Sequence, residues 1–140
     1  MGEMNRVLFK SMSDEWRTPK SVYESLNSEF KFMFDPCPMG GLWDGINRAW
    51  EFPAFCNPPY KRIKDWVKKA FEESRHGTVV LLIPSRTDTR WWHEYVMKAK
   101  EIRFIKGRLK FGDSKNAAPF PSCVVVFDCG PEGKLWEKKG

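Results

Sequence analysis

The spacing of the hydrophobic residues changes along the chain, and the first clear pattern is helical. Val22, Leu26 and Phe30 recur at intervals of four, which places them on one face of a helix. Thr18 and Pro19 precede this pattern, and they suit the N-cap and the first helical position. We therefore expect a helix that begins behind Thr18 and buries one face.

Two later segments show the same kind of pattern. Apolar residues at positions 63, 66, 67, 70 and 71 share one helical face, and lysines occupy the other face. Gly77 is expected to stop this helix, and Asp88 is expected to cap a third one. The third helix carries Trp91 and Trp92. Because neighbours on a helix point in different directions, we expect one of these two rings to be exposed.

Apolar and β-branched runs between the helices predict strands. The expected strands cover residues 30–35, 52–56, 78–83, 102–105 and 122–127. A turn at Gly107 is expected to enter one more short strand that ends at Phe111. Strands that alternate with helices, followed by a final pair of neighbouring strands, imply an α/β fold. We expect its sheet to be mostly parallel, with an antiparallel edge.

Length and composition narrow the class of protein. The chain has 140 residues, which suits one domain over 16–130, with an N-terminal arm over 1–15 and a polar tail over 131–140. The net charge of +6 favours a polyanionic partner. The aromatic share of 15% includes 7 tryptophans, so some rings are expected in a pocket or on the surface.

The four cysteines form no CxxC pair, and the two histidines do not stand beside them. We therefore expect no metal site and reduced thiols, as in a cytoplasmic protein. No apolar run approaches the length that spans a bilayer, and no signal peptide is visible. A cytoplasmic location without a membrane partner is the expectation.

The motif Asn57-Pro58-Pro59-Tyr60 follows the expected strand 52–56. Two consecutive prolines end a strand, because neither can donate to a ladder and each restricts the residue before it. The motif thus leaves an amide, fixed carbonyls and an aromatic ring at the carboxyl end of a sheet, where α/β proteins bind ligands. A proline-rich turn without a ligand is an equally good interpretation of these four residues alone.

A planar amine on a flipped base fits this motif. The Asn57 amide oxygen and the Pro58 carbonyl would accept its two N–H bonds, and Tyr60 would stack on its ring. Accepting both bonds pulls the nitrogen toward tetrahedral geometry, so its lone pair can attack an electrophilic methyl group. Asp35, at the end of the first expected strand, could accept from the amino group of the methyl donor or reach its hydroxyls.

Six stretches occur in order between Trp16 and Phe127. They are Trp16-Arg17-Thr18-Pro19, Phe34-Asp35-Pro36-Cys37, Cys56-Asn57-Pro58-Pro59-Tyr60, Leu82-Ile83-Pro84-Ser85-Arg86-Thr87-Asp88-Thr89, Gly107-Arg108-Leu109-Lys110-Phe111 and Pro119-Phe120-Pro121-Ser122. In these stretches the chain resembles the small phage-type DNA N6-adenine methyltransferases, which use S-adenosylmethionine. The resemblance implies a compact, truncated Rossmann-like methyltransferase fold and direct methyl transfer to the N6 amine of a flipped adenine.

The resemblance also assigns roles to residues. By it, the catalytic motif consists of Asn57, Pro58, Pro59 and Tyr60. The S-adenosylmethionine pocket would be lined by Trp16, Thr18, Pro19, Asp35, Pro36 and Cys37. The chain departs from larger methyltransferases before Asn57, because it lacks their glycine-rich FxGxG signature and is too short there for two of their strands. Asp44 is the candidate in this gap for the acidic residue that holds the donor ribose.

No segment is left over for a separate target-recognition domain, so we expect relaxed or very short sequence specificity, or recognition by a homodimer. The DNA phosphates would meet basic residues near the motif, namely Lys61, Arg62, Lys64, Arg86, Arg90, Arg108 and Lys110. Two alternatives stay open. One is a methyltransferase for RNA or for protein glutamine, where NPPY also occurs. The other is a non-catalytic nucleic-acid-binding module with a methyltransferase-like fold.

Overall fold

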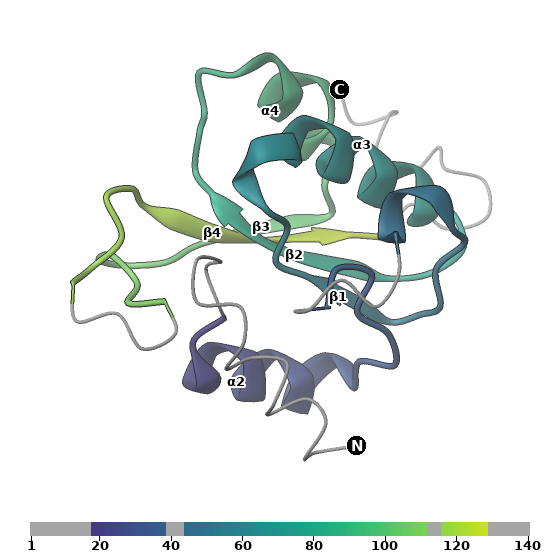
Figure 1. Cartoon of the computed structure of the whole chain (residues 1–140), viewed down its shortest axis with the longest axis horizontal. Coiled ribbons are helices and arrows are strands. Elements are labelled where there is room, and N and C mark those ends of the chain that lie inside the picture. The colour runs from purple at the N-terminus through teal and green to yellow at the C-terminus, as the bar shows by residue number, and fades with distance from the viewer. Residues whose placement is uncertain (1–17, 39–43, 112–115, 129–140) are drawn as a thin grey trace.

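The computed structural model describes residues 18–38, 44–111 and 116–128, and in them a four-stranded sheet lies between helices (Figure 1). The strands are β1 (Ala54–Cys56), β2 (Val79–Pro84), β3 (Glu101–Phe104) and β4 (Ser122–Phe127). The α-helices are α2 (Lys20–Phe30), α3 (Ile63–Glu73) and α4 (Arg90–Glu94). Three 3-10 turns accompany them, η1 (Gly45–Asn47), η2 (Tyr60–Arg62) and η3 (Val96–Lys98).

The sheet has the order β1-β2-β4-β3 and is mixed. β1 and β2 are parallel, whereas β4 is antiparallel to both of its neighbours. The prediction of a mostly parallel sheet is therefore wrong, although the α/β class is confirmed. The physical reason lies in the connection from β3 to β4. Its described residues, 105–111 and 116–121, form no helix that would cross the sheet. β4 starts at the edge where β3 ends and runs back between β2 and β3.

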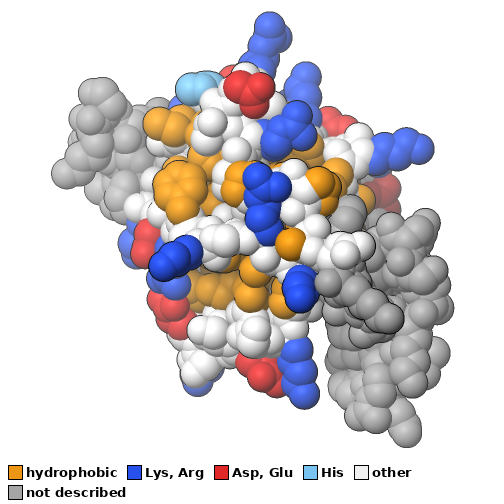
Figure 2. Space-filling view, turned by 90° about the vertical axis from the view of Figure 1, so that its left-hand side faces the viewer, with side chains coloured by type: hydrophobic (Ala, Val, Ile, Leu, Met, Phe, Trp, Pro, Cys, Tyr) orange, Lys and Arg blue, Asp and Glu red, His pale blue; other side chains and the backbone are white. Residues whose placement is uncertain are grey.

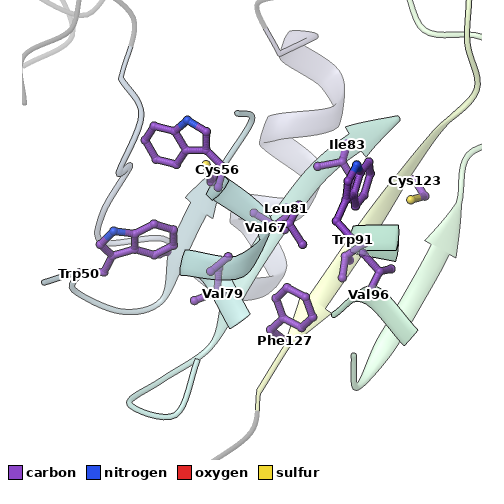
Figure 3. Packing of buried hydrophobic residues seen from close by; sticks show 14 of the residues in the cluster. Trp50, Cys56, Val67, Val79, Leu81, Ile83, Trp91, Val96, Cys123 and Phe127 are labelled. Atoms are coloured by element: carbon purple, nitrogen blue, oxygen red, sulfur yellow. The ribbon is translucent and has the colours of Figure 1, made fainter. Parts of the chain in front are cut away.

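Both faces of the sheet are covered, which explains why β2 and β4 are apolar at every position except Ser122. α2 lies on one face, and α3 and α4 lie on the other (Figure 1). All residues of β2 and β4 are buried. On the face of α3 and α4, residues from the strands pack against Val67, Trp91 and Val96 (Figure 3). On the other face, Leu26 of α2 packs with Phe55 and Val80.

The expected strand 30–35 is reduced to a single parallel bridge between Phe34 and Ala54. α2 continues through Phe30, and Lys31 closes it in the left-handed region with a φ of 57°. Too few residues remain for a strand before Asp35, so the prediction of a full strand is wrong. The alternation itself is real, since Phe34 is buried and Met33 is exposed. The short strand expected to end at Phe111 is also not formed in the described part of the chain.

Two helix caps differ from the predictions. The N-cap of α2 is Pro19, with an extended ψ of 136° and no capping side chain, so Thr18 is not the cap. The N-cap of α4 is Thr89, whose Oγ1 accepts from the Trp92 N–H at 3.3 Å, so Asp88 is not the cap either. Thr89 takes this place because its hydroxyl also donates to the Arg86 carbonyl at 2.7 Å, which closes the turn one residue later than predicted.

Trp91 and Trp92 are both buried, at 8% and 2% exposure, so the prediction that one ring is exposed is wrong. The short helix α4 is covered on two sides. The Trp92 ring stacks on Phe104 of β3 with a centroid distance of 6.4 Å, and Trp91 lies with Ile63 of α3 around a pocket. Two different neighbours thus bury two rings that point in different directions. Among the described residues, no helix combines the length and the apolar character that a bilayer crossing requires.

Candidate active site

One edge of the sheet collects the motifs that were singled out in the sequence. β1 and β2 are parallel and end there at Cys56 and Pro84, next to the bridge residue Phe34. β4 begins at the same edge, because Ser122 pairs with Pro84. Asp35, Asn57 and the turn that follows Pro84 therefore come together, although they are far apart in the sequence. This juxtaposition is what the position of the parallel strands predicts.

The Asn57 side chain is partly buried at the end of β1. Its Nδ2 donates to Thr18 Oγ1 at 3.0 Å, across the gap between the segment before α2 and the loop after β1. Pro58 is fully buried, and Pro59 is the N-cap of η2 with an extended ψ of 142°. The two prolines thus fix the backbone that carries Asn57 on one side and Tyr60 on the other. The contact with Thr18 was not foreseen from the sequence.

Tyr60 opens onto a pocket with a volume of about 270 Å³. Its ring meets Phe120 edge-on, with 5.1 Å between the centroids and 80° between the planes. Burial raises the pKa of the Tyr60 phenol above its ordinary value, so the ring is neutral at physiological pH. The full lining consists of Tyr60, Ile63, Pro84, Arg86, Thr89, Trp91 and Phe120. A pocket with aromatic walls and a few polar groups is suited to a planar, partly polar ligand.

Arg86 belongs to this lining and is also exposed to solvent. Hydrogen bonds hold the turn that carries it. The Arg86 carbonyl accepts from the Thr89 backbone N–H at 3.1 Å and from its hydroxyl. The Ser85 N–H donates to the Pro121 carbonyl at 2.9 Å, which ties this turn to the loop that carries Phe120. A guanidinium on a fixed turn at the mouth of a pocket is a suitable phosphate ligand.

Asp35 carries the most perturbed carboxylate among the described residues. Burial raises its pKa from the ordinary value of 3.8 to about 6, while the Cys37 N–H, which donates to Asp35 Oδ1 at 2.8 Å, acts in the opposite direction. Burial raises the pKa values of Tyr23 and Cys56, and the Asp35 charge adds to both shifts. A partly desolvated carboxylate with one short hydrogen bond retains acceptor capacity for a ligand.

The remaining donor-pocket residues differ in their surroundings. Pro36 is fully buried, and its carbonyl lies against Gly45 so closely that a Cβ on that glycine would come within 1.9 Å. Cys37 is half-buried. Trp16 lies outside the described residues. Asp44 is exposed, and its carboxylate accepts from the Ile46 N–H at 3.1 Å and from Asn47 Nδ2 at 2.6 Å.

The predicted phosphate-binding residues are all exposed: Lys61, Arg62, Lys64, Arg86, Arg90, Arg108 and Lys110. Figure 2 shows the side of the molecule on which the loop before β4 projects, and there Lys and Arg side chains stand among hydrophobic patches. Arg62 is paired with Asp65 at 3.3 Å, and Arg90 lies 4.0 Å from Glu94. Such exposed ion pairs contribute little to stability.

Sequence reasoning assigned only Tyr60 and Arg86 to this pocket. It missed the other lining residues, which are Ile63, Pro84, Thr89, Trp91 and Phe120. Pro119 and Pro121 on either side of Phe120 were a usable signal, because two prolines hold a ring in one place. No group of three or more His, Cys, Asp or Glu residues that could hold a metal ion is formed within the described ranges.

Comparison with known proteins gives a consistent result. A family model described as DNA N-6-adenine-methyltransferase (Dam) matches residues 6–127. The chain is 29% identical to a DNA N-6-adenine-methyltransferase of Haemophilus phage HP1, with 90% of this chain and 86% of that protein covered. It is 27% identical to one of Escherichia phage T1, with 71% of this chain covered and 48%, about half, of the T1 protein. No solved structure matches the chain.

Proposed function

The chain belongs to the DNA N-6-adenine-methyltransferase (Dam) family, and on this premise we propose that it transfers a methyl group from S-adenosylmethionine to the N6 amine of adenine in DNA. The observation that carries the proposal is the position of Asn57-Pro58-Pro59-Tyr60. The motif ends a parallel strand and presents Tyr60 to a pocket with aromatic walls. The relatives that the chain resembles carry this activity in their names.

The residues of the motif have different roles in binding the adenine base. The Asn57 amide oxygen and the Pro58 carbonyl accept the two N–H bonds of the adenine amine and hold its nitrogen for attack. Tyr60 supports the ring of a base that has left its stack, and its edge-on partner Phe120 keeps the Tyr60 ring in place. With the donor bound, the nitrogen lone pair would form the new bond to the methyl carbon while the methyl–sulfur bond breaks and S-adenosylhomocysteine leaves. N6 would afterwards lose a proton to water. Orientation and fixed dipoles are the source of the rate enhancement.

The residues near Asp35 suit the methyl donor, which supplies an electrophilic methyl group when it is bound. The Asp35 carboxylate is buried enough to have its pKa raised to about 6, and a cationic amino group beside it would relieve this cost. Thr18, Pro19, Pro36 and Cys37 would line the same pocket, with Trp16 preceding them in the chain. Asp44 stays a candidate for the donor ribose, although its carboxylate already caps η1.

The fold that we propose is a truncated Rossmann-like methyltransferase fold. Three strands, β1, β2 and β3, run in one direction with β4 reversed among them, and helices cover both faces. We further propose that residues 16–130 form one catalytic domain. We propose that its sequence specificity is relaxed or very short, or comes from a homodimer.

DNA would bind across the sheet edge that carries the pocket. Arg86 is the best-supported phosphate ligand, because it lines the pocket from a hydrogen-bonded turn. Further phosphate contacts would come from Lys61, Arg62, Lys64, Arg90, Arg108 and Lys110. The relatives are phage proteins, which supports action in the cytoplasm of an infected host cell.

Incubation with labelled S-adenosylmethionine and DNA tests the proposal. We expect the label at N6 of adenine, identified after digestion to nucleosides. Label only at cytosine N4, in RNA or on protein glutamine would refute the assignment and favour the second enzyme class. Calorimetric titration with S-adenosylmethionine separates the third class, because a non-catalytic module with a methyltransferase-like fold would bind none. Parallel assays on single-stranded and duplex DNA define the form of the substrate.

A further inference from the structure

The hydrogen bond between Asn57 and Thr18 joins two parts of the chain that lie 39 residues apart. Asn57 directly follows β1, and Thr18 lies just before α2. Both side chains are partly buried. A contact of 3.0 Å between an amide nitrogen and a hydroxyl oxygen has ordinary hydrogen-bond length. It fixes the two side-chain torsions of Asn57, χ1 and χ2, which would otherwise be free to rotate.

An amide side chain has two chemically different ends, and methyl transfer needs only one of them. Its oxygen accepts hydrogen bonds, whereas its nitrogen donates them. The adenine amine also donates, so an Asn57 side chain turned the wrong way would place two donors against each other. We propose that Thr18 is a positioning residue that holds the Asn57 nitrogen and thereby keeps the Asn57 oxygen turned to the adenine amine. This inference rests on the proposed function of Asn57.

The two partners are supported by the same rigid elements. The Tyr23 N–H in the first turn of α2 donates to the Pro19 carbonyl at 3.0 Å, next to Thr18. The Tyr23 ring meets Phe55 of β1 edge-on at 5.2 Å, and Phe55 lies two residues before Asn57. The hydroxyl of Thr18 is thus placed relative to β1 by packing of α2 on the sheet. The residue that contacts Asn57 is thus itself held in place by the packing of Tyr23 on Phe55. Precise sites require such support for their functional side chains.

This role can be separated from direct contact with the methyl donor, which the family resemblance suggests for Thr18. A residue that binds the donor changes the dissociation constant for S-adenosylmethionine. A residue that orients Asn57 changes kcat and leaves that constant in place, because Asn57 acts on the adenine. The values of kcat, of the KM for DNA and of the donor dissociation constant therefore separate the two roles in each variant.

Thr18→Val removes the hydroxyl and keeps the shape of the side chain. We expect kcat to fall about tenfold, the size of effect that loss of one orienting hydrogen bond produces, with the donor dissociation constant unchanged within about twofold. Thr18→Ser restores the hydroxyl and should return most of kcat. The matched control is Thr78→Val, which removes a hydroxyl bonded to Asp128 at 3.2 Å at the other end of β2 and should leave kcat unchanged.

A second readout does not depend on turnover. In ¹⁵N-labelled protein, the side-chain amide signals of Asn57 are identified by their absence in Asn57→Ala. These signals should move in Thr18→Val, return toward their positions in Thr18→Ser and stay in place in Thr78→Val. An active wild type with unmoved signals and unchanged kcat in Thr18→Val would overturn the positioning role, as would a loss confined to donor affinity. A wild type that binds S-adenosylmethionine but methylates no adenine would instead overturn the proposed function.

Discussion

Asp35→Asn should stabilise the folded protein at neutral pH while it weakens binding of the methyl donor. Burial raises the pKa of Asp35 from its ordinary value of 3.8 to about 6. The folded state therefore holds this proton more tightly than the unfolded chain does. Between these two pKa values, folding takes up a proton, so the stability contributed by this group falls as the pH rises. Above about pH 6 the full cost of the buried charge is present.

The expected gain in stability of Asp35→Asn follows from the shift of the Asp35 pKa. About two pH units correspond to ~3 kcal/mol at neutral pH, since each unit is ~1.4 kcal/mol. A neutral asparagine has the same shape and does not titrate, so Asp35→Asn should recover up to this amount. Roughly half of the gain, ~1.4 kcal/mol, should develop between about pH 5 and about pH 7.5. The variant and the wild type should converge as the pH approaches 4.

Urea unfolding of both proteins at several pH values measures this difference directly. Asp44→Asn is the matched control of opposite sign. Hydrogen bonds from Asn47 and from the Ile46 backbone hold the pKa of Asp44 below its ordinary value. Its charge therefore stabilises the fold above the pKa of the unfolded chain, and this contribution is lost as the pH falls. Asp44→Asn should reduce stability at neutral pH, where Asp35→Asn increases it.

Donor binding supplies the other half of the test. If a cationic amino group binds beside Asp35, S-adenosylmethionine should bind more tightly to the wild type as the pH rises through about 6, and the Asp35→Asn variant should bind weakly at every pH. Calorimetry across this range measures both. If the stability of Asp35→Asn depended on pH as that of the wild type does, burial would not raise the pKa of Asp35. Undiminished donor affinity in the variant would remove Asp35 from the donor site.

Three further changes test other parts of the structure. Asn57→Ala should lower kcat by at least about 100-fold and leave the donor dissociation constant in place, because it removes an aimed acceptor; near-normal transfer would exclude the mechanism. Arg86→Gln should weaken DNA binding and reduce the slope of log affinity against log salt concentration by about one. The control Arg75→Gln, beyond the far end of α3, should change neither. Equal slopes in the two variants would mean that Arg86 does not contact phosphate. Gly45→Ala should lower the free energy of unfolding by about 1 to 3 kcal/mol in a urea titration, since its Cβ would meet the Pro36 carbonyl at 1.9 Å, and an unchanged midpoint would contradict that packing.

The predicted elements that were confirmed are those with strong local signals. The apolar face over 63–71 produced α3, because its burial requires only a helix and a neighbouring sheet. The apolar runs expected as strands at 78–83 and 122–127 produced β2 (Val79–Pro84) and β4 (Ser122–Phe127), which are buried on both faces. The ends of elements were predicted less well. The caps at Thr18 and Asp88 and the strand before Asp35 depend on competing hydrogen bonds that no local pattern reveals.

The candidate site could be predicted in part for a similar reason. Asn57 and Tyr60 stand out because two prolines separate them, and their chemistry is visible in the residue types. The family prediction, which rested on the ordered stretches, is confirmed. The hydrogen bond from Asn57 to Thr18 could not be foreseen, because it depends on how α2 packs against β1. Long-range contacts of this kind are products of the fold.

The antiparallel direction of β4 shapes the pocket. In a mostly parallel sheet, the segment before each strand would lie at the edge opposite the ligand. β4 is antiparallel to β2, so it begins at the edge where β1 and β2 end. Phe120, just before β4, therefore reaches the Tyr60 ring, and the Pro121 carbonyl accepts from Ser85 beside Arg86. The reversed strand thus supplies a wall of the pocket from a part of the chain that a parallel arrangement would have carried away from it.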